Sequence, residues 1–361
     1  MNIGIIGCGL TANLHAHAIQ SLGYNVKWVI ATNQASAKVF SEKWGVNNHA
    51  QILSDNILSQ LDCIHICTPP AFHYELVKQC LLKGIHVVCE KPLSLSKKEA
   101  KELMHLANKN QLINAVNFNN RFYEACEKAR LIIQNNDFGK PLLIHGSYQQ
   151  EFHALPEPYS WRYQSKSAGS LRATSEIGTH LLDLIHYWTD LNVIEVSANL
   201  TSFKPVRYLN KGVMLAEDPQ DDSEKVYVFS DDAAIISIKF ENGAIGNIVL
   251  SEISHGRSNS LKLEIVGEKQ SVWWDSEKSN CLNTAKKGEG ITQSINAFSP
   301  NYSNTISELI QLVYSDISSK DSPKAYPTFR DGYLNACLCD AIYESSKNNG
   351  AWVSLEVQGH E

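Results

Sequence analysis

The sequence lacks a charge excess of either sign and any long apolar segment. Its 361 residues carry 32 Lys and Arg against 38 Asp and Glu, a net charge of −6, without a run of like charges. Nucleic-acid binding requires a basic face that neutralises phosphates, so we expect no nucleic-acid partner. No stretch approaches 18 uninterrupted apolar residues, and the first residues lack a basic segment followed by a long apolar one. We therefore expect no membrane span and no secretory signal.

The cysteines lack the spacings typical of metal sites or a disulfide framework. Nine are scattered through the chain, an odd number, and no pair has CxxC spacing. Cys63, His65 and Cys67 alternate along one strand face, but the run is apolar, which favours buried thiols over a metal or redox site. This usage indicates a reducing compartment, and we expect a cytoplasmic protein.

The chain is long enough for two domains, and its first 120 residues have a distinct rhythm. Short β-rich runs alternate with helical patterns of 10–15 residues, which predicts βαβ units and a parallel sheet. The strands are apolar on both faces, as expected when helices cover both sides. We expect strands at 3–6, 26–31, 63–67, 86–89 and 113–116, with helices at 11–22, 35–44, 72–83 and 97–109.

After residue 120 the pattern changes to helices followed by a run of strands. This predicts a second, α+β domain over 121–361 with one large, mostly antiparallel sheet. We expect helices at 122–134, 177–188, 304–317 and 331–346, and strands at 142–148, 195–203, 224–229, 233–240, 244–251, 261–266 and 271–274. Residues 204–223 and 276–298 are rich in Asp, Asn, Gly and Lys and are expected to be loops.

A glycine turn follows the first predicted strand and opens the first helix. It has the pattern G-x-G-x-x-A: Gly7 permits the tight turn, Gly9 lets a pyrophosphate approach the backbone, and Ala12 keeps the helix close to the strand. The helix start, with Leu10 and Thr11, offers free N–H groups to an anion. We therefore predict a Rossmann-type dinucleotide site over residues 1–120, the alternative being a glycine-rich turn without a ligand.

The second predicted strand ends without the acid that normally binds the adenosine ribose. Ala31, Thr32 and Asn33 stand there, and Lys38 follows about one helical turn into the next helix. Nothing repels a 2′-phosphate, but no arginine is present to bind one strongly. NAD and NADP both remain possible, and Lys38 favours NADP by about tenfold.

Two further motifs carry side chains suited to acid–base chemistry. Glu90-Lys91-Pro92 ends the fourth long strand, at the sheet edge where open α/β folds bind ligands, although the tripeptide alone fits a surface lysine better. Glu176, His180 and Asp183 have i, i+4, i+7 spacing on one helical face, and a histidine between carboxylates suits general acid–base catalysis. A metal site and a capped helix start are the alternatives for this face.

Together these motifs resemble the Gfo/Idh/MocA family of oxidoreductases, which includes glucose–fructose oxidoreductase and inositol dehydrogenase. The resemblance extends over nearly the whole chain. It is carried by the glycine turn, Thr68-Pro69-Pro70 with His73, Glu90-Lys91-Pro92, the Glu-Ile-Gly-Thr-His helix at 176–180, Phe240-Glu241-Asn242-Gly243-Ala244 and Phe329-Arg330-Asp331-Gly332.

The resemblance implies roles for individual residues. It makes Lys91 and His180 catalytic, and it puts Glu176 where the family has an aspartate. It implies substrate contacts at Arg121 and Tyr159, and Asp183 also lies on the substrate side. Implied cofactor contacts are Gly7, Gly9, Leu10, Thr11, Ala12, Thr32, Asn33, Thr68, Pro69, His73, Glu90, Lys91, Asn117, Trp161, Arg162 and Tyr302. For His15, His17 and His153 we expect surface or capping roles.

The expected activity is hydride transfer between C4 of the nicotinamide and a sugar, cyclitol or related polyol. By resemblance the substrate lies in a cleft between the domains, and the protein is a dimer or tetramer formed through the open sheet. We expect no metal. One alternative is a regulator of the same family without catalysis, but such members lose the lysine–histidine pair. The other, a metal-dependent hydrolase built on Glu176, His180 and Asp183, leaves the glycine turn unexplained.

Overall fold

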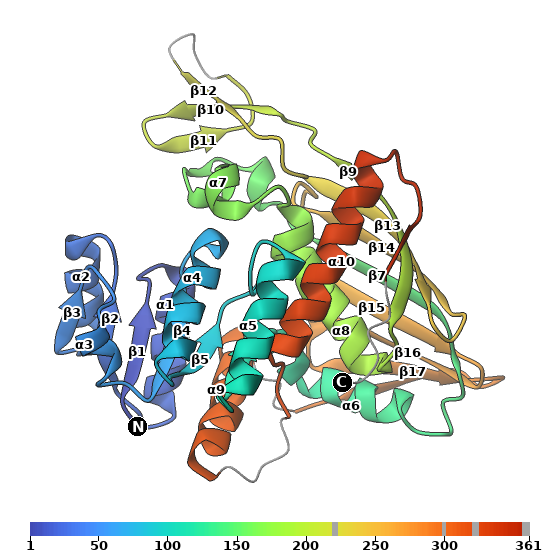
Figure 1. The fold of residues 1–361 in the computed structure, drawn as a ribbon. Coiled ribbons are helices and arrows are strands. Elements are labelled where there is room, and N and C mark those ends of the chain that lie inside the picture. Colours follow the sequence, from blue (N-terminus) through green and yellow to red (C-terminus); the bar gives the residue numbers. More distant parts are fainter. Residues whose placement is uncertain (219–222, 298–300, 320–324, 356–361) are drawn as a thin grey trace. The chain divides into compact units, whose positions relative to one another are not determined.

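The computed structural model describes residues 1–218, 223–297, 301–319 and 325–355, and the chain divides into two compact units (Figure 1). Unit 1 comprises Met1–Phe122 and Pro300–Ala336, and unit 2 comprises Tyr123–Ser299 and Cys337–Glu361. The chain thus returns to unit 1 before its last long helix, α10 (Phe329–Lys347), runs on into unit 2. None of the helices in the described ranges combines the length and apolar composition needed to cross a bilayer.

Unit 1 is built on six parallel strands in the order β3-β2-β1-β4-β5-β6. This is the strand order of the dinucleotide-binding fold, so the predicted Rossmann domain is confirmed. The strands are β1 (Ile3–Ile6), β2 (Val26–Ile30), β3 (Asn48–Ala50), β4 (Cys63–Ile66), β5 (His86–Cys89) and β6 (Asn114–Val116). The connecting helices are α1 (Leu10–Ser21), α2 (Gln34–Trp44), α3 (Asp55–Leu58), α4 (His73–Leu82) and α5 (Lys97–Lys109). The sequence did not indicate β3 or α3, because elements this short show no periodicity.

The core of unit 1 includes a helix from the C-terminal part of the chain. Helix α9 (Tyr302–Ser319) packs against α1 and buries Ile306, Leu309, Ile310 and Val313. These residues have the spacing of one apolar helical face. The same cluster includes Cys63 and Cys67 of the β4 region, which are buried free thiols as expected.

Unit 2 contains a nine-stranded sheet in the order β18-β17-β16-β15-β7-β14-β13-β9-β19. Only the β14–β7 pair is parallel, so the predicted large, mostly antiparallel sheet is confirmed. The strands are β7 (Pro141–Gln149), β9 (Val193–Thr201), β13 (Ala233–Phe240), β14 (Ile245–Ser251), β15 (Ser260–Gly267), β16 (Gln270–Asp275), β17 (Cys281–Lys286), β18 (Ile291–Ile295) and β19 (Val353–Ser354).

The two faces of this sheet differ in character. Helices α6 (Glu124–Ile133) and α8 (Thr179–Thr189) pack on one face, where alternate residues such as Ile236 and Ile248 are buried. Gly178 lets the start of α8 lie close to the sheet, because a Cβ there would come within 2.6 Å of Leu250 Cδ1. On the opposite face, Ile235 and Ile245 are more than half exposed.

Both long loops predicted in unit 2 are wrong in part. Residues 204–223 contain β10 (Val206–Asn210) and β11 (Val213–Leu215), which join β12 (Glu224–Tyr227) and β8 (Glu157–Pro158) in a separate four-stranded sheet. Residues 276–298 contain β17 and β18. β18 is exposed along its whole length and β11 has only three residues, so neither shows the apolar alternation that indicates a strand. Positions 219–222 and 298, which belonged to the same predictions, lie outside the described residues.

Candidate active site

The glycine turn has the geometry expected of a phosphate-binding loop. Gly7 has φ +109°, and a Cβ there would collide with the Cys67 carbonyl oxygen, so both the backbone angle and the close approach require glycine. A Cβ at Gly9 would meet nothing within 4 Å, which leaves space over the start of α1. No side chain caps this helix end, and Ala12 is fully buried behind it. An anion would find free N–H groups here.

An open pocket of about 550 Å³ lies beyond β2, where the adenosine end of a dinucleotide is expected. Thr32, Asn33, Lys38, His49 and Gln51 line it, and its lining contains neither an acid nor an arginine. The Asn33 side chain is already used, because it accepts a 3.0 Å hydrogen bond from Ser36 N and caps α2. Lys38 Nζ lies 3.9 Å from Glu42, and both side chains are exposed.

The loops after β4 and β5 are tied together by His73. Its Nε2 lies 2.8 Å from the Thr68 carbonyl oxygen and its Nδ1 2.8 Å from that of Pro92. His73 is fully buried, and burial lowers its pKa. The resemblance implied that His73 contacts the cofactor. Its observed contacts are with the backbone of Thr68, which precedes Pro69, and of Pro92, which follows Lys91.

A buried chain of polar side chains ends at Glu90. Glu90 Oε1 lies 3.0 Å from His15 Nε2, His15 Nδ1 lies 2.8 Å from His65 Nδ1, and His65 Nε2 lies 2.7 Å from Tyr314 Oη. The expectation of a surface or capping role is therefore wrong for His15, because α1 turns it into the sheet rather than toward solvent. His17, two residues on, is exposed as expected.

Two buried polar atoms at the carboxyl edge of this sheet have no hydrogen-bond partner among the described residues. They are Thr68 Oγ1, after β4, and Asn117 Oδ1, after β6. Asn117 Nδ2 donates to Glu90 Oε1 at 2.8 Å, which fixes the orientation of the amide. Orphaned polar atoms are costly unless a ligand or water pairs with them, so this edge fits a dinucleotide.

The remaining predicted residues of unit 1 lie near its C-terminal segment. Arg121 is buried and donates from Nη2 to Asp331 Oδ1 at 2.7 Å. This hydrogen bond ties the start of α10 to the segment that follows β6. Tyr302 is the first residue of α9 and is partly exposed. Substrate contact by Arg121 remains a prediction, but the observed partner is internal.

In unit 2 the predicted catalytic helix begins differently from the sequence expectation. Residues Thr174–Gly178 form a π-helical turn, which continues into α8 at Thr179. A π turn advances fewer degrees per residue than an α-helix, so the predicted common face holds for His180 and Asp183 but not strictly for Glu176. The side chains of His180 and Asp183 are both buried. Such turns are frequent at functional sites.

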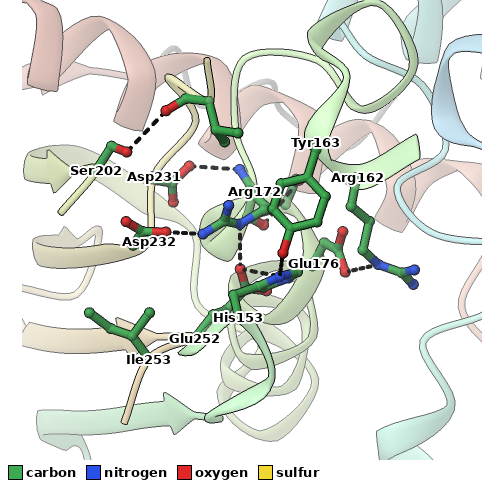
Figure 2. Close-up of polar contacts among 12 residues, drawn as sticks. His153, Arg162, Tyr163, Arg172, Glu176, Ser202, Asp231, Asp232, Glu252 and Ile253 are labelled. Carbon is green, nitrogen blue, oxygen red and sulfur yellow. Dashed lines mark hydrogen bonds and ion pairs between the residues drawn. The ribbon is translucent and has the colours of Figure 1, made fainter. Parts of the chain in front are cut away.

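Glu176 contacts the aromatic stretch that precedes it. Its Oε2 accepts a 2.7 Å hydrogen bond from Arg162 Nε (Figure 2). The Arg162 guanidinium lies over the Trp161 ring, 4.7 Å from the ring centroid. Tyr159 is partly exposed and stacks on Tyr163 at 6.4 Å between ring centroids. Direct contacts in unit 2 therefore join three of the residues that the resemblance implied, Glu176, Arg162 and Trp161.

Behind Glu176 lies a buried charged cluster that the sequence did not reveal (Figure 2). His153 Nδ1 contacts Glu157 at 2.5 Å, and His153 Nε2 lies 3.5 Å from Glu252. The expected surface role for His153 is therefore wrong. Arg172 pairs with both Glu252 and Asp232, and Arg207 also pairs with Asp232. Burial raises the pKa of Glu252, and Glu176 adds to this because two carboxylates face each other.

The cluster includes three side chains with metal-ligand chemistry. Ligand atoms of His153, Glu176 and Glu252 lie within 4.8 Å of one another. Arg162 and Arg172 already supply positive charge to the two carboxylates. Of the three residues on the helical face for which a metal site was the alternative interpretation, only Glu176 belongs to this group.

Sequence reasoning missed the contact between His65 and Tyr314 inside unit 1. The one available signal was His65, a histidine inside an otherwise apolar strand, since a buried polar group requires a partner. Its partner Tyr314 is 249 positions away, and nothing in the sequence links the two.

Comparison with known families shows which family the two parts of the chain belong to. Residues 1–118 match the oxidoreductase family with an NAD-binding Rossmann fold known as GFO_IDH_MocA, and residues 130–355 match its C-terminal alpha/beta domain. The chain belongs to the Gfo/Idh/MocA family. The resemblance drawn from the motifs is confirmed, and the protein is an oxidoreductase of an NAD-binding family.

Similar proteins span the whole chain. Levoglucosan dehydrogenase of Pseudarthrobacter phenanthrenivorans is 28% identical over 391 residues, covering 98% of either chain. Glucose-6-phosphate 3-dehydrogenase of Bacillus subtilis is 24% identical and covers 96% of this chain and 97% of its own. A solved structure of levoglucosan dehydrogenase in complex with NADH has a TM-score of 0.87 at 26% identity, covering 99% of each chain.

Proposed function

We propose that this Gfo/Idh/MocA oxidoreductase transfers a hydride between a nicotinamide dinucleotide and a CH–OH group of a sugar, cyclitol or related polyol. The observation that carries the proposal is that each family-matched domain has a reactive side chain: Lys91 follows β5, and His180 lies in the first turn of α8. The names of the full-length relatives, which act on levoglucosan and glucose 6-phosphate, support a carbohydrate substrate.

Residues 1–120 bind the dinucleotide in this proposal. The free N–H groups at the start of α1 take the pyrophosphate, Thr32, Asn33 and Lys38 surround the adenosine, and the orphaned atoms of Thr68 and Asn117 take polar groups of the nicotinamide half. The bound cofactor accepts or donates the hydride, and the protein supplies position and electrostatics.

The acid–base chemistry uses Lys91 of residues 1–120 together with His180 and its neighbouring carboxylates of residues 121–361. Lys91 donates a hydrogen bond to the reacting oxygen, which polarises the C–O bond, and His180 exchanges the hydroxyl proton. Glu176 or Asp183 orients the imidazole and stabilises its protonated form. Trp161 and Arg162 adjoin Glu176, and Tyr159 and Arg121 are the remaining candidates for substrate contact.

A substrate panel tests this proposal. Levoglucosan, glucose, glucose 6-phosphate and myo-inositol are each incubated with NAD and with NADP, and reduced nicotinamide is followed by its absorbance. We expect turnover of at least one of these compounds. Tight dinucleotide binding without turnover of any sugar or polyol would instead favour a non-catalytic regulator, and absence of binding would remove both.

The assembly and cellular location belong to the same proposal. We propose a homo-oligomer formed through the uncovered face of the nine-stranded sheet, supported by its exposed Leu143, Ile235 and Ile245. Sedimentation of the wild type and of Ile235→Lys tests this, since a charge at the interface should dissociate the assembly. A cytoplasmic location is supported by the cysteines, all nine of which are free thiols.

A further inference from the structure

Four buried side chains form a continuous hydrogen-bonded chain from α9 to the carboxyl end of β5. It runs from Tyr314 through His65 and His15 to Glu90, with contacts of 2.7, 2.8 and 3.0 Å. His15 and His65 are fully buried, and Tyr314 and Glu90 are at most 6% exposed. Water therefore does not compete for these hydrogen bonds.

The proton positions along this chain are restricted. With neutral His15, Tyr314 donates to His65, His65 donates to His15, and His15 donates from Nε2 to Glu90. With protonated His15, the hydrogen bonds between His15 and His65 and between His65 and Tyr314 reverse direction, but His15 Nε2 still donates to Glu90. Burial and the neighbouring His15 lower the pKa of His65, so His65 is neutral in both arrangements. Each arrangement presents an N–H to the Glu90 carboxylate.

Other donors reinforce the charge on Glu90. Asn117 Nδ2 donates to Oε1 at 2.8 Å, and the Lys91 backbone N–H lies 3.3 Å from Oε2. Burial opposes ionisation of Glu90, but the hydrogen bond and charge of His15, then Asn117 and Lys91, outweigh it and lower the pKa to about 2. The Glu90 carboxylate in the interior of unit 1 is therefore ionised at neutral pH.

The charge lies in the half of the sheet that serves the nicotinamide. In this strand order, β1 to β3 form one mononucleotide-binding half and β4 to β6 the other, and ligands bind at the carboxyl ends. Glu90 and Asn117 follow β5 and β6, and the unpaired Asn117 Oδ1 marks a place for a ligand donor. An oxidised nicotinamide ring carries a positive charge, whereas the reduced ring is neutral.

We propose that His15, His65 and Tyr314 are positioning residues that keep Glu90 ionised and oriented, and that the Glu90 carboxylate favours binding of the oxidised over the reduced cofactor. The inference rests on the proposed dinucleotide binding and deepens it. A carboxylate in a poorly solvated site attracts a nearby cation more strongly than it would in water. We expect Glu90 to contribute about tenfold to the preference, which corresponds to 1.4 kcal/mol.

The test compares dissociation constants of the oxidised and reduced forms of whichever cofactor binds more tightly, measured by calorimetry on the full chain. Glu90→Gln should lower the preference for the oxidised form about tenfold. Tyr314→Phe and His15→Leu should lower it less and in the same direction. His15→Gln, which keeps an N–H near Glu90, should restore part of it. His17→Leu is the matched control, because His17 lies exposed on the same helix.

The ratio of the two constants distinguishes positioning from simple structural support. Equal weakening of both forms, or an unchanged ratio in Glu90→Gln, overturns the inference while leaving dinucleotide binding intact. If His15→Leu does not fold, Glu90→Gln and Tyr314→Phe decide the question. A wild type that binds neither form contradicts the proposed function itself, and the inference falls with it.

Discussion

Glu176 and Arg162 form a 2.7 Å ion pair, and this pair joins the predicted catalytic carboxylate to the aromatic stretch before it (Figure 2). The resemblance assigned the two residues to different tasks, catalysis and cofactor contact. The ion pair links the two residues directly, and a second carboxylate, Glu252, lies within 4.8 Å of Glu176. The charge of residue 176 should therefore matter more than its length.

The first prediction concerns that charge. Glu176→Gln should lower kcat about 10²-fold, because a neutral amide cannot stabilise a protonated His180. Glu176→Asp keeps the charge and should retain most of the activity. Steady-state kinetics with the substrate found in the panel measures both. Equal loss in the two variants would mean that side-chain length, not charge, is what the site requires.

The second prediction concerns the two reactive side chains. Lys91→Ala and His180→Ala should each lower kcat by about 10² to 10⁴, the range for a positioned acid–base group, and should change dinucleotide affinity little. Lys83→Ala is a suitable control, since Lys83 is partly exposed and pairs with the exposed Asp55. Near wild-type turnover in both variants would remove Lys91 and His180 from the mechanism.

The third prediction concerns cofactor choice. Lys38 is the cation lining the pocket beyond β2, and the exposed Glu42 lies 3.9 Å from it. A single partly screened lysine should give a preference for NADP of tenfold or less. Lys38→Ala should weaken NADP and leave NAD unchanged, as measured by calorimetric titration. A preference above a thousandfold in either direction would show that another residue dominates this pocket.

The fourth prediction concerns the stability of unit 2. Asp232→Asn leaves Arg172 and Arg207 buried with less compensating charge, and should lower the free energy of unfolding by about 3–5 kcal/mol. Lys239→Met breaks a partly exposed pair with Glu195 and should cost at most about 1 kcal/mol. Urea unfolding measures both. Similar losses in the two variants would show that burial does not set the cost.

The fifth prediction concerns stability in acid. The pKa of Glu90 is lowered from 4.5 to about 2 in the folded state, so folding favours the ionised form of this carboxyl group. This contribution is fully present above pH 4.5 and is lost as the pH falls toward 2. Its size is about 3 kcal/mol. The stability difference between wild type and Glu90→Gln should shrink over that interval, and a constant difference would contradict the shift.

Local patterns were enough to determine the fold class and the main candidate residues. The turn at Gly7 and Gly9 requires glycine for reasons of backbone angle and space, so it can be recognised from spacing alone. The parallel sheet was predictable because buried strands and amphipathic helices have different apolar periods. Lys91 could be placed at the ligand-binding edge because it directly follows such a strand.

Contacts between distant segments decided the rest. Tyr314 reaches His65 only because α9 returns to unit 1, and His153 meets Glu252 only when η3 (Phe152–Ala154) and the end of β14 fold together. The amino-acid sequence by itself determined the fold class and most of the long helices and strands, since those depend on neighbours a few residues away, but it did not indicate the short or polar strands such as β3 and β18. Which buried charges pair, and so which carboxylates stay ionised, was decided by the tertiary structure, because desolvation and hydrogen bonding depend on side chains that only the folded chain brings together.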